Sequence, residues 1–185
     1  MAVDRDELEE PRSLVLPRET PPAQFGPLAG FARIWRAKWQ GDRLPGWSDF
    51  DFYDFAGWHG FVYVDEVVAR DPLDLRCRLW GTKLTDLLGS DETGRLFSQS
   101  PAAAAPGRLQ ANTRLVREGL IGLSVGRALN WGRQIRFTVL KLPCAEDGVT
   151  VDHILGCARP EWPGDPPFKM PDSAPPESAP PESVA

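Results

Sequence analysis

The chain has 185 residues, 42% of them hydrophobic and 25% charged, and a formal net charge of −5 at pH 7. This length allows one domain of roughly 130 residues once the polar ends are set aside, and the acidic balance argues against nucleic-acid binding through the whole surface. No apolar stretch reaches the ~20 residues of a membrane span, and the acidic start is unlike a signal peptide, so we expect a cytoplasmic protein.

The two ends of the chain differ in composition from the middle. Residues 1–26 are rich in Asp, Glu, Arg and Pro around one apolar patch, Leu14–Leu16, and we expect a disordered arm. The alternative is that this patch docks on a sheet edge or in the groove of a partner. Residues 161–185 contain the direct repeat SAPPE and are expected to form an extended, disordered tail. The domain is therefore predicted over residues 27–160.

A first helix is predicted over Pro27–Gln40, followed by Gly41. Its apolar side chains recur every three or four residues, which is typical of one packed helix face. They are Leu28, Phe31, Ile34, Trp35 and Trp39. Such a stripe packs either on its own domain or on a second molecule. These residues are therefore the candidate interface for a homodimer or a protein partner.

The next segment, Leu44–Gly60, is both aromatic and acidic. Its aromatic side chains are expected to anchor an irregular segment over the core. They are Trp47, Phe50, Phe52 and Phe55. Asp49, Asp51 and Asp54 could suggest a metal site, but the downstream Gly and acidic ligand of a calcium loop are missing. We expect these carboxylates to stay in solvent or to cap turns.

Two β-rich segments, Phe61–Val68 and Leu75–Trp80, are joined by a turn at Asp71–Pro72 and predict an antiparallel hairpin. In the second segment every other residue from Leu75 to Leu79 is apolar, which predicts one buried face.

A short helix is predicted at Thr82–Leu88, with Thr82 as its N-terminal cap and Gly89 as a left-handed C-terminal residue. A longer helix is predicted within Pro101–Glu118, with the regular part beginning near Pro106. The inward stripe of this helix comprises Ala105, Leu109, Asn112, Val116 and Leu120.

Three more strands are predicted at Leu123–Leu129, Arg133–Leu142 and Val151–Ala158, with turns over residues 130–132 and 143–148. Runs of strands separated by helices, with hairpins at both ends, favour an α+β fold with an antiparallel sheet over an alternating β/α fold.

The element order and the central motif resemble those of PAS domains. The motif comprises Leu79–Thr82 (LWGT) and Gly89–Arg95 (GSDETGR), and the closing strand VDHILGC is also similar to the end of that family. Over residues 31–160 the chain is similar to a branch of bacterial PAS proteins with an L-x-G-T and a G-x-D-x-T-G-R motif. Trp80 departs from this pattern, because an aliphatic residue is more usual there.

The resemblance implies a five-stranded antiparallel sheet with helices on one face that enclose a small-molecule pocket. It also implies sensing and protein–protein interaction, commonly with dimerisation through the N-terminal helix, and it does not imply catalysis. We therefore expect a signalling module that binds a small molecule, a protein partner or both. The alternatives are a ligand-free adaptor, with Trp80, Phe137 and Leu155 filling the core, and an enzyme that uses the pocket.

Seven residues are candidates for contact with a ligand in this pocket: Leu79, Thr82, Leu88, Arg95, Phe137, His153 and Leu155. Arg95 either holds its loop by pairing with Asp91 or a carbonyl group, or binds an anionic group of the ligand. His153 has the strand parity of Leu155, so it either faces the pocket as a hydrogen-bonding or haem-ligating group or is a satisfied core histidine.

No pattern in the sequence indicates catalysis, a metal or a particular cofactor. Cys77, Cys144 and Cys157 lack CxxC or paired spacing, so neither a disulfide framework nor a zinc site is expected. Cys77 and Cys157 are expected to be small buried apolar residues. A Ser-His-Asp order, a Gly-rich phosphate loop and a metal triad are all missing from the sequence.

Overall fold

The chain is organised around a six-stranded antiparallel sheet with the strand order β1-β4-β5-β6-β2-β3. The computed structural model describes residues 12–100, 103, 107–130, 133–162, 164–166 and 168–171. The strands are β1 (Arg12–Leu16), β2 (Val62–Arg70), β3 (Leu73–Trp80), β4 (Ile121–Asn130), β5 (Arg133–Cys144) and β6 (His153–Pro160).

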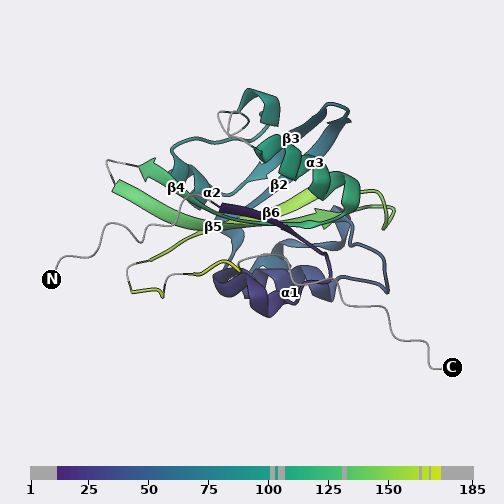
Figure 1. Ribbon diagram of the computed structural model, residues 1–185, viewed down its shortest axis with the longest axis horizontal. Coiled ribbons are helices and arrows are strands. Elements are labelled where there is room, and N and C mark those ends of the chain that lie inside the picture. The colour runs from purple at the N-terminus through teal and green to yellow at the C-terminus, as the bar shows by residue number, and fades with distance from the viewer. Residues whose placement is uncertain are drawn as a thin grey trace.

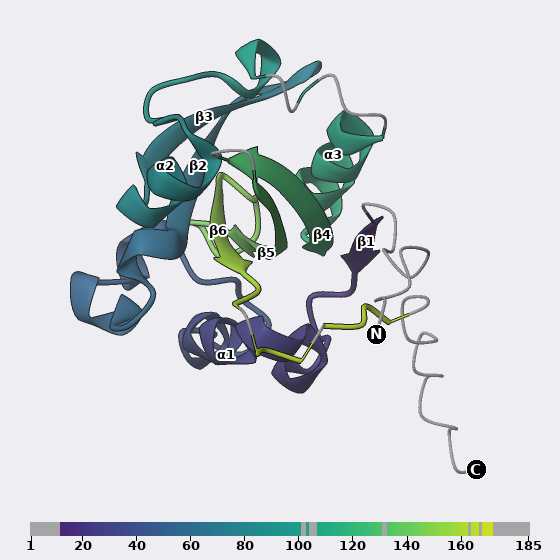
Figure 2. The same ribbon diagram turned by 90° about the vertical axis from the view of Figure 1, so that its left-hand side faces the viewer.

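Helices cover both faces of this sheet. The α-helices are α1 (Ala29–Ala37), α2 (Thr82–Leu88) and α3 (Arg108–Glu118). Short 3-10 helices are η1 (Pro22–Leu28), η2 (Trp47–Asp49), η3 (Phe52–Phe55), η4 (His59–Phe61) and η5 (Phe97–Gln99). Figure 1 shows α1 on one side of the sheet and α2 and α3 on the other. Figure 2 shows the same arrangement, with α2 and α3 standing apart from each other above the sheet. We call the α1 side the back face and the other side the front face.

The predicted α+β class and antiparallel sheet are confirmed, but the sheet has six strands and not five. Strands β2 to β6 are the five predicted ones, and β1 is added at the edge of β4, with Leu14 opposite Leu123 and Leu16 opposite Ile121. The expectation of a disordered arm is therefore wrong for Arg12–Leu16. The free edge of β4 offers unpaired backbone groups, and β1 satisfies them while burying Leu16 completely.

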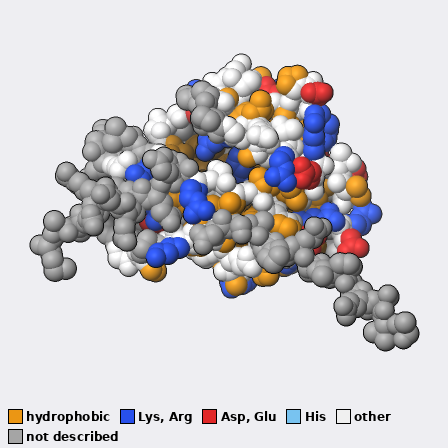
Figure 3. All heavy atoms as spheres, viewed as in Figure 1, with side chains coloured by type: hydrophobic (Ala, Val, Ile, Leu, Met, Phe, Trp, Pro, Cys, Tyr) orange, Lys and Arg blue, Asp and Glu red, His pale blue; other side chains and the backbone are white. Residues whose placement is uncertain are grey.

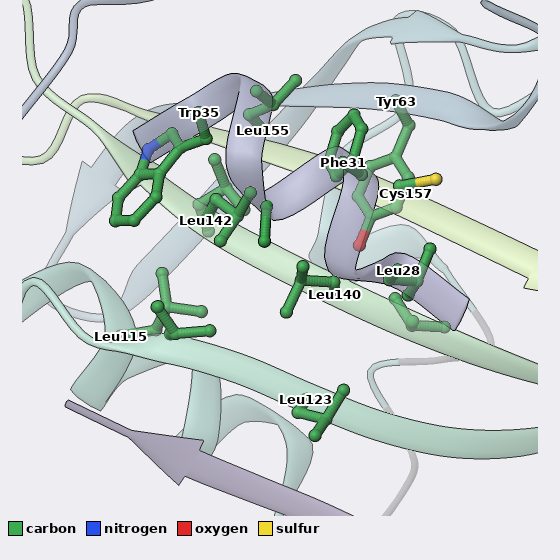
Figure 4. Close-up of a cluster of buried hydrophobic side chains, with 14 of the residues drawn as sticks. Leu28, Phe31, Trp35, Tyr63, Leu115, Leu123, Leu140, Leu142, Leu155 and Cys157 are labelled. Atoms are coloured by element: carbon green, nitrogen blue, oxygen red, sulfur yellow. The ribbon is translucent and has the colours of Figure 1, made fainter. Parts of the chain in front are cut away.

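The apolar stripe of the first helix is buried against the sheet of its own chain. Leu28, Phe31 and Trp35 are at most 1% exposed. Figure 4 shows them beside side chains from β5 and β6: Leu140, Leu142, Leu155 and Cys157. The Trp35 indole Nε1–H also donates to the Pro143 carbonyl oxygen at 2.9 Å. These three side chains are thus part of the core in this arrangement and not a free interface, whereas Ile34 and Trp39 are half-buried at its margin.

The aromatic segment that follows α1 closes one end of the back face. Phe55 is buried, and its ring lies 6.1 Å from that of Trp47 and 5.6 Å from that of Phe50. Phe52 differs from expectation, because it is 69% exposed and stacks on His59 with ring centroids 3.9 Å apart. The Phe52 ring is therefore covered on one side by the His59 imidazole and is not buried in the core.

The acidic residues of this segment cap turns, as expected. The Asp51 carboxylate accepts hydrogen bonds from the backbone of Tyr53 and Asp54, and Asp54 accepts one from the Asp51 backbone. The Asp49 carboxylate accepts one from the Gly46 backbone. Their oxygens thus bind backbone N–H groups at the start of short helices.

Two predicted helix starts are shifted. Gly81, and not Thr82, is the N-terminal cap of α2, and no side chain caps this helix, whereas Gly89 ends it in the left-handed conformation, as expected. Helix α3 begins at Arg108. The predicted start at residues 101–106 lies mostly outside the described residues, as do two positions of the predicted turn at 130–132 and the SAPPE repeat.

The predicted C-terminal tail is ordered at its beginning. Met170 is 4% exposed and belongs to the core, and the ring of Phe168 lies where a Cβ on Gly26 would be. Because Phe168 packs against Gly26 of η1 and Met170 is buried in the core, the expectation of disorder is wrong for residues 168–171.

We predict that Trp35→Phe lowers the free energy of unfolding by about 1–3 kcal/mol, because it removes packed atoms and leaves the buried Pro143 carbonyl without its donor. Urea unfolding measures this change. Arg33→Ala, on the exposed side of the same helix, is the control and is expected to stay within ~0.5 kcal/mol of the wild type. Equal stability of Trp35→Phe and the wild type would contradict the described packing of α1.

Candidate functional site

A cavity of about 720 Å³ lies on the front face of the sheet. Its floor comes from strands β2 to β6 and its walls from β1, α2, η5 and α3. Its apolar lining includes Leu75, Trp80, Leu88, Phe97, Leu115, Phe137 and Val139, and its polar lining includes Asp65, Arg95, Arg108, Asn112, Arg127 and Lys141. A space of this size, apolar with a few polar groups, is typical of a site for a small organic molecule.

Strand alternation decides which side chains form the floor. Along β5, Phe137, Val139 and Lys141 line the cavity, whereas Leu140 and Leu142 point to the back face. On β4, glycines lie opposite two of these residues: Gly126 pairs with Phe137 and Gly122 with Lys141. A Cβ on Gly126 would be 2.9 Å from the Phe137 ring, so the glycine gives the ring its place on the floor.

A β-bulge in β3 places Trp80 in the cavity. Asp65 on β2 pairs with Cys77, and the residue before it, Val64, pairs with Leu79, so Arg78 is an extra residue on β3. The extra residue reverses the alternation of side chains beyond it. Cys77 and Trp80 therefore both line the cavity, and Leu79 lies on the other face and is 39% exposed.

A glycine is required at position 81, directly after β3, because the backbone lies close to that of Gly60 and Val62 there. The Gly81 N–H donates to the Val62 carbonyl oxygen at 2.9 Å, and a Cβ on Gly81 would collide with the Gly60 carbonyl. Any larger residue would push α2 away from η4. The glycine thus fixes α2 close to the sheet, with Leu84 buried and Leu88 lining the cavity.

The loop that carries the second motif is fastened to β3. Gly94 N–H donates to the Cys77 carbonyl at 2.7 Å, and Cys77 N–H donates to the Arg95 carbonyl at 3.0 Å. The Asp91 carboxylate accepts from Thr93 N–H at 2.9 Å, as expected for a local turn. Arg95 pairs with Glu92 at 3.1 Å and not with Asp91, and both Arg95 and Glu92 line the cavity.

A polar contact joins the sheet to α3 inside the cavity. The Lys141 ammonium donates to Asn112 Oδ1 at 2.7 Å. The pKa of Lys141 is lowered to about 8, mainly by burial; the Asp65 charge opposes this shift and the positive charge of Arg108 adds to it. Burial likewise raises the pKa of Asp65 to about 6, against the attraction of Lys141.

Tyr63 and Arg108 belong to the same cluster. Burial raises the pKa of Tyr63 well above its ordinary value, the Asp65 charge raises it further, and the Arg108 charge opposes the shift. Arg108 therefore lies within electrostatic range of both the Tyr63 hydroxyl and the Lys141 ammonium. The cluster can hold a polar group of a ligand and can exchange protons with it near neutral pH.

The cysteines are reduced and buried, and their environment makes them unreactive. Burial raises the pKa of Cys77 to about 12 and raises those of Cys144 and Cys157 as well. Within the described part of the chain no three His, Cys, Asp or Glu side chains come together in a way that could hold a metal ion. Neither His59 nor His153 lines the cavity.

Three of the seven predicted ligand residues line the cavity: Leu88, Arg95 and Phe137. The other four do not, and each has a physical reason. Leu79 is turned away by the bulge, and Thr82 is exposed on the outer side of α2. His153 and Leu155 share a parity, as predicted, but that parity faces α1, where Leu155 packs beside Trp35 and His153 Nδ1 lies 2.8 Å from Asp152.

The sequence interpretation missed the polar cluster, although two of its members carried a signal. Lys141 has the parity of Phe137 and Val139 in the predicted strand. Asn112 stands on the inward stripe of the predicted helix, and it is 2% exposed. Polar residues at inward positions of two different elements are what a polar contact across a cavity requires. Asp65 and Arg108 carried no such signal.

On the face of the molecule seen in Figure 3, the described charged side chains do not gather into one patch. Figure 3 shows Lys and Arg side chains in separate groups between hydrophobic and uncharged surface. In the part of the chain that the structure describes, no helix is long and apolar enough to cross a membrane.

Comparison with known proteins gives one family match. The family model described as PAS domain matches residues 25–159. No curated protein matches the chain. Among solved structures, one described as "Structure of an RNA-binding Light-Oxygen-Voltage Receptor" matches with a TM-score of 0.46 and 14% sequence identity. That match covers 82% of this chain and 38% of the other.

We predict that Lys141→Met changes the pH dependence of stability. The pKa of Lys141 lies near 8 in the folded protein and at its ordinary 10.5 when unfolded, so the unfolded state binds more protons between these values. The Lys141 contribution to stability therefore rises with pH through this window. Relative to the variant, the wild type should gain about 1–3 kcal/mol between pH 8 and pH 10.

Urea unfolding of both proteins at several pH values measures this difference. Because Tyr63 and the three cysteines titrate in both proteins, their contributions cancel in the comparison. Parallel stability curves across this range would contradict the burial of the Lys141 ammonium.

Proposed function

The chain belongs to the PAS domain family, and we propose on this premise that it is a sensory module whose cavity binds a small organic molecule and whose output is a change in protein–protein contact. The matched residues 25–159 include α1, strands β2 to β6 and almost the whole cavity lining. Because a fold alone does not fix function, the proposal rests on the cavity.

The observation that carries the proposal is that the side chains of the described residues leave a cavity on the front face. The adaptor alternative requires Trp80, Phe137 and Leu155 to pack the interior. Trp80 and Phe137 instead line a cavity of about 720 Å³, and Leu155 lies on the back face. The apolar part of such a lining gains packing contacts when an organic molecule lies against it.

The element best placed to report occupancy of the cavity is β1. It precedes the residues matched by the family model, and Ser13, Leu14 and Val15 line the cavity. Within the described residues it pairs only with β4, at the edge of the sheet, and packs on α3. A ligand that contacts these side chains binds the docked state of β1 better than the released state and so shifts the equilibrium between them.

The first helix, the candidate interface of the sequence analysis, is less suited to move. The Leu28, Phe31 and Trp35 side chains are buried in the core, so displacing α1 would expose large apolar side chains to water. Releasing β1 breaks five residues of strand pairing at an edge, a smaller rearrangement. We therefore propose that a protein partner or a second copy responds to the position of β1.

A second candidate is a small-molecule enzyme that uses the cavity. The observation in its favour is the pair of shifted pKa values, near 6 for Asp65 and near 8 for Lys141, which are suited to proton transfer at neutral pH. The sensory function is preferred because the same groups also serve to bind a polar ligand and because the family match points to signalling.

We predict that a cavity-filling substitution abolishes ligand retention. Ala111 lines the cavity from α3, and Ala111→Phe places a ring inside it. Native mass spectrometry of the purified wild type, after incubation with a metabolite extract, should show a bound small molecule, and this mass should be lost in Ala111→Phe. Gln110→Phe is the matched control. The neighbouring Gln110 is exposed, so this substitution adds the same ring outside the cavity.

Hydrogen exchange tests the proposed role of β1 on the same samples. The amides of β1 should exchange at least threefold more slowly in the ligand-bound protein than in protein unfolded, dialysed and refolded without ligand. A persistent ligand-free mass would contradict ligand binding, and unchanged exchange in β1 on binding would contradict its role in output.

A further inference from the structure

Two buried donors in the cavity lining have no acceptor. The Asn112 Nδ2 and Trp80 Nε1 atoms are inaccessible to solvent and have no hydrogen-bond partner among the described residues. The orientation of the Asn112 amide is fixed, because its oxygen accepts from the Lys141 ammonium at 2.7 Å. A buried donor without a partner is unfavourable, so Asn112 Nδ2 favours an incoming acceptor.

The charged groups of the described cavity lining carry both signs. The described cavity lining contains four basic side chains, Arg95, Arg108, Arg127 and Lys141, and two acidic ones, Asp65 and Glu92. Glu92 neutralises Arg95 through their ion pair at 3.1 Å. Lys141 and Asp65 stabilise each other's charge.

Arg108 completes this site. It lines the cavity from the first turn of α3, one helical turn before Asn112, and its guanidinium makes no ion pair or side-chain hydrogen bond to the described residues. Residues four apart on a helix lie on the same side. Arg108 and Asn112 therefore approach the Lys141 ammonium from the same wall.

The rest of the lining is apolar and aromatic. Leu115 and Lys141 are both next to Gly122, so Leu115 lies beside this polar corner, and Val139, Phe137, Trp80 and Phe97 line the rest of the cavity. The complementary molecule therefore has one anionic, acceptor-rich end and an apolar body.

On the proposed function as premise, we infer that the cavity recognises an organic monocarboxylate, whose carboxylate is bound by Arg108, Asn112 Nδ2 and Lys141 and whose apolar body lies along Phe137 and Trp80. A carboxylate brings acceptors to the unpaired amide and one negative charge to a corner with a small excess of positive charge. A phosphate dianion fits less well, because the Asp65 carboxylate lies within range of the same ammonium and repels a second negative charge.

Matched acid and amide pairs test this inference by isothermal titration calorimetry on the full chain. The probes are 3-phenylpropionate, 1-naphthylacetate and decanoate, each beside its primary amide, with inorganic phosphate as a separate probe. At least one acid should bind ten times more tightly than its amide, and phosphate should bind more weakly than that acid.

Two variants should remove the preference for the acid. Asn112→Asp keeps the size of the side chain and its contact with Lys141 but replaces the N–H donor by a repelling oxygen, and Arg108→Gln removes the charge. Each should lower acid affinity at least tenfold with the amide affinity changed less than twofold. Arg114→Gln is the matched control, because Arg114 carries the same charge on the exposed side of α3, paired with Glu118, and should change neither affinity.

The outcomes separate this inference from the proposed function. Acids and amides binding equally, or Asn112→Asp keeping the acid preference with an unchanged melting temperature, would overturn the carboxylate assignment and leave ligand binding intact. Tighter binding of phosphate would also overturn it. If no probe binds, the carboxylate assignment is overturned. The proposed function is contradicted only if native mass spectrometry of the wild type also shows no bound small molecule.

Discussion

The structure depends on the need to cover both apolar faces of one sheet. A sheet with two apolar faces exposed to water is unstable, so each face requires its own layer. The back face is covered by α1, which packs closely on it: Trp35 fills space there and also donates a hydrogen bond to the Pro143 carbonyl. The front face is covered by two helices that stand apart, with α2 held down at Gly81 and α3 held by the Lys141–Asn112 contact. The cavity is the space that this second, looser layer leaves.

The polar groups in that space oppose stability and so indicate a use. Asp65 and Lys141 both have pKa values displaced toward their neutral forms, which means that the folded protein bears a cost for keeping them charged. Leu140 and Leu142, on the other face of the same strand, show that β5 also supplies apolar packing. Charge retained at an inward position in spite of its cost is typical of a binding site.

Much of the fold could be predicted from the sequence, because alternation in strands and the three-to-four spacing in helices report burial directly. Strands β2 to β6 and helices α1 and α2 follow from these patterns. Parity states that His153 and Leu155 share a face but not which one, so the choice of the cavity face was wrong. The bulge at Arg78 has no local sequence signature. For this reason Leu79 was predicted to line the cavity, whereas Trp80 lines it in the structure. The contact of Lys141 with Asn112 depends on the packing of two distant segments and could not be read from either.

The sixth strand has a consequence for association between molecules. While β1 is paired, the backbone groups along the edge of β4 are satisfied within one chain. When β1 leaves, this edge becomes a template for any extended segment of suitable register, and the β1 of a second copy has the required sequence. Reciprocal exchange of β1 would then join two molecules without any new type of contact, as in domain swapping. The same strand that lines the cavity therefore also determines whether the sheet ends within one molecule or continues into another.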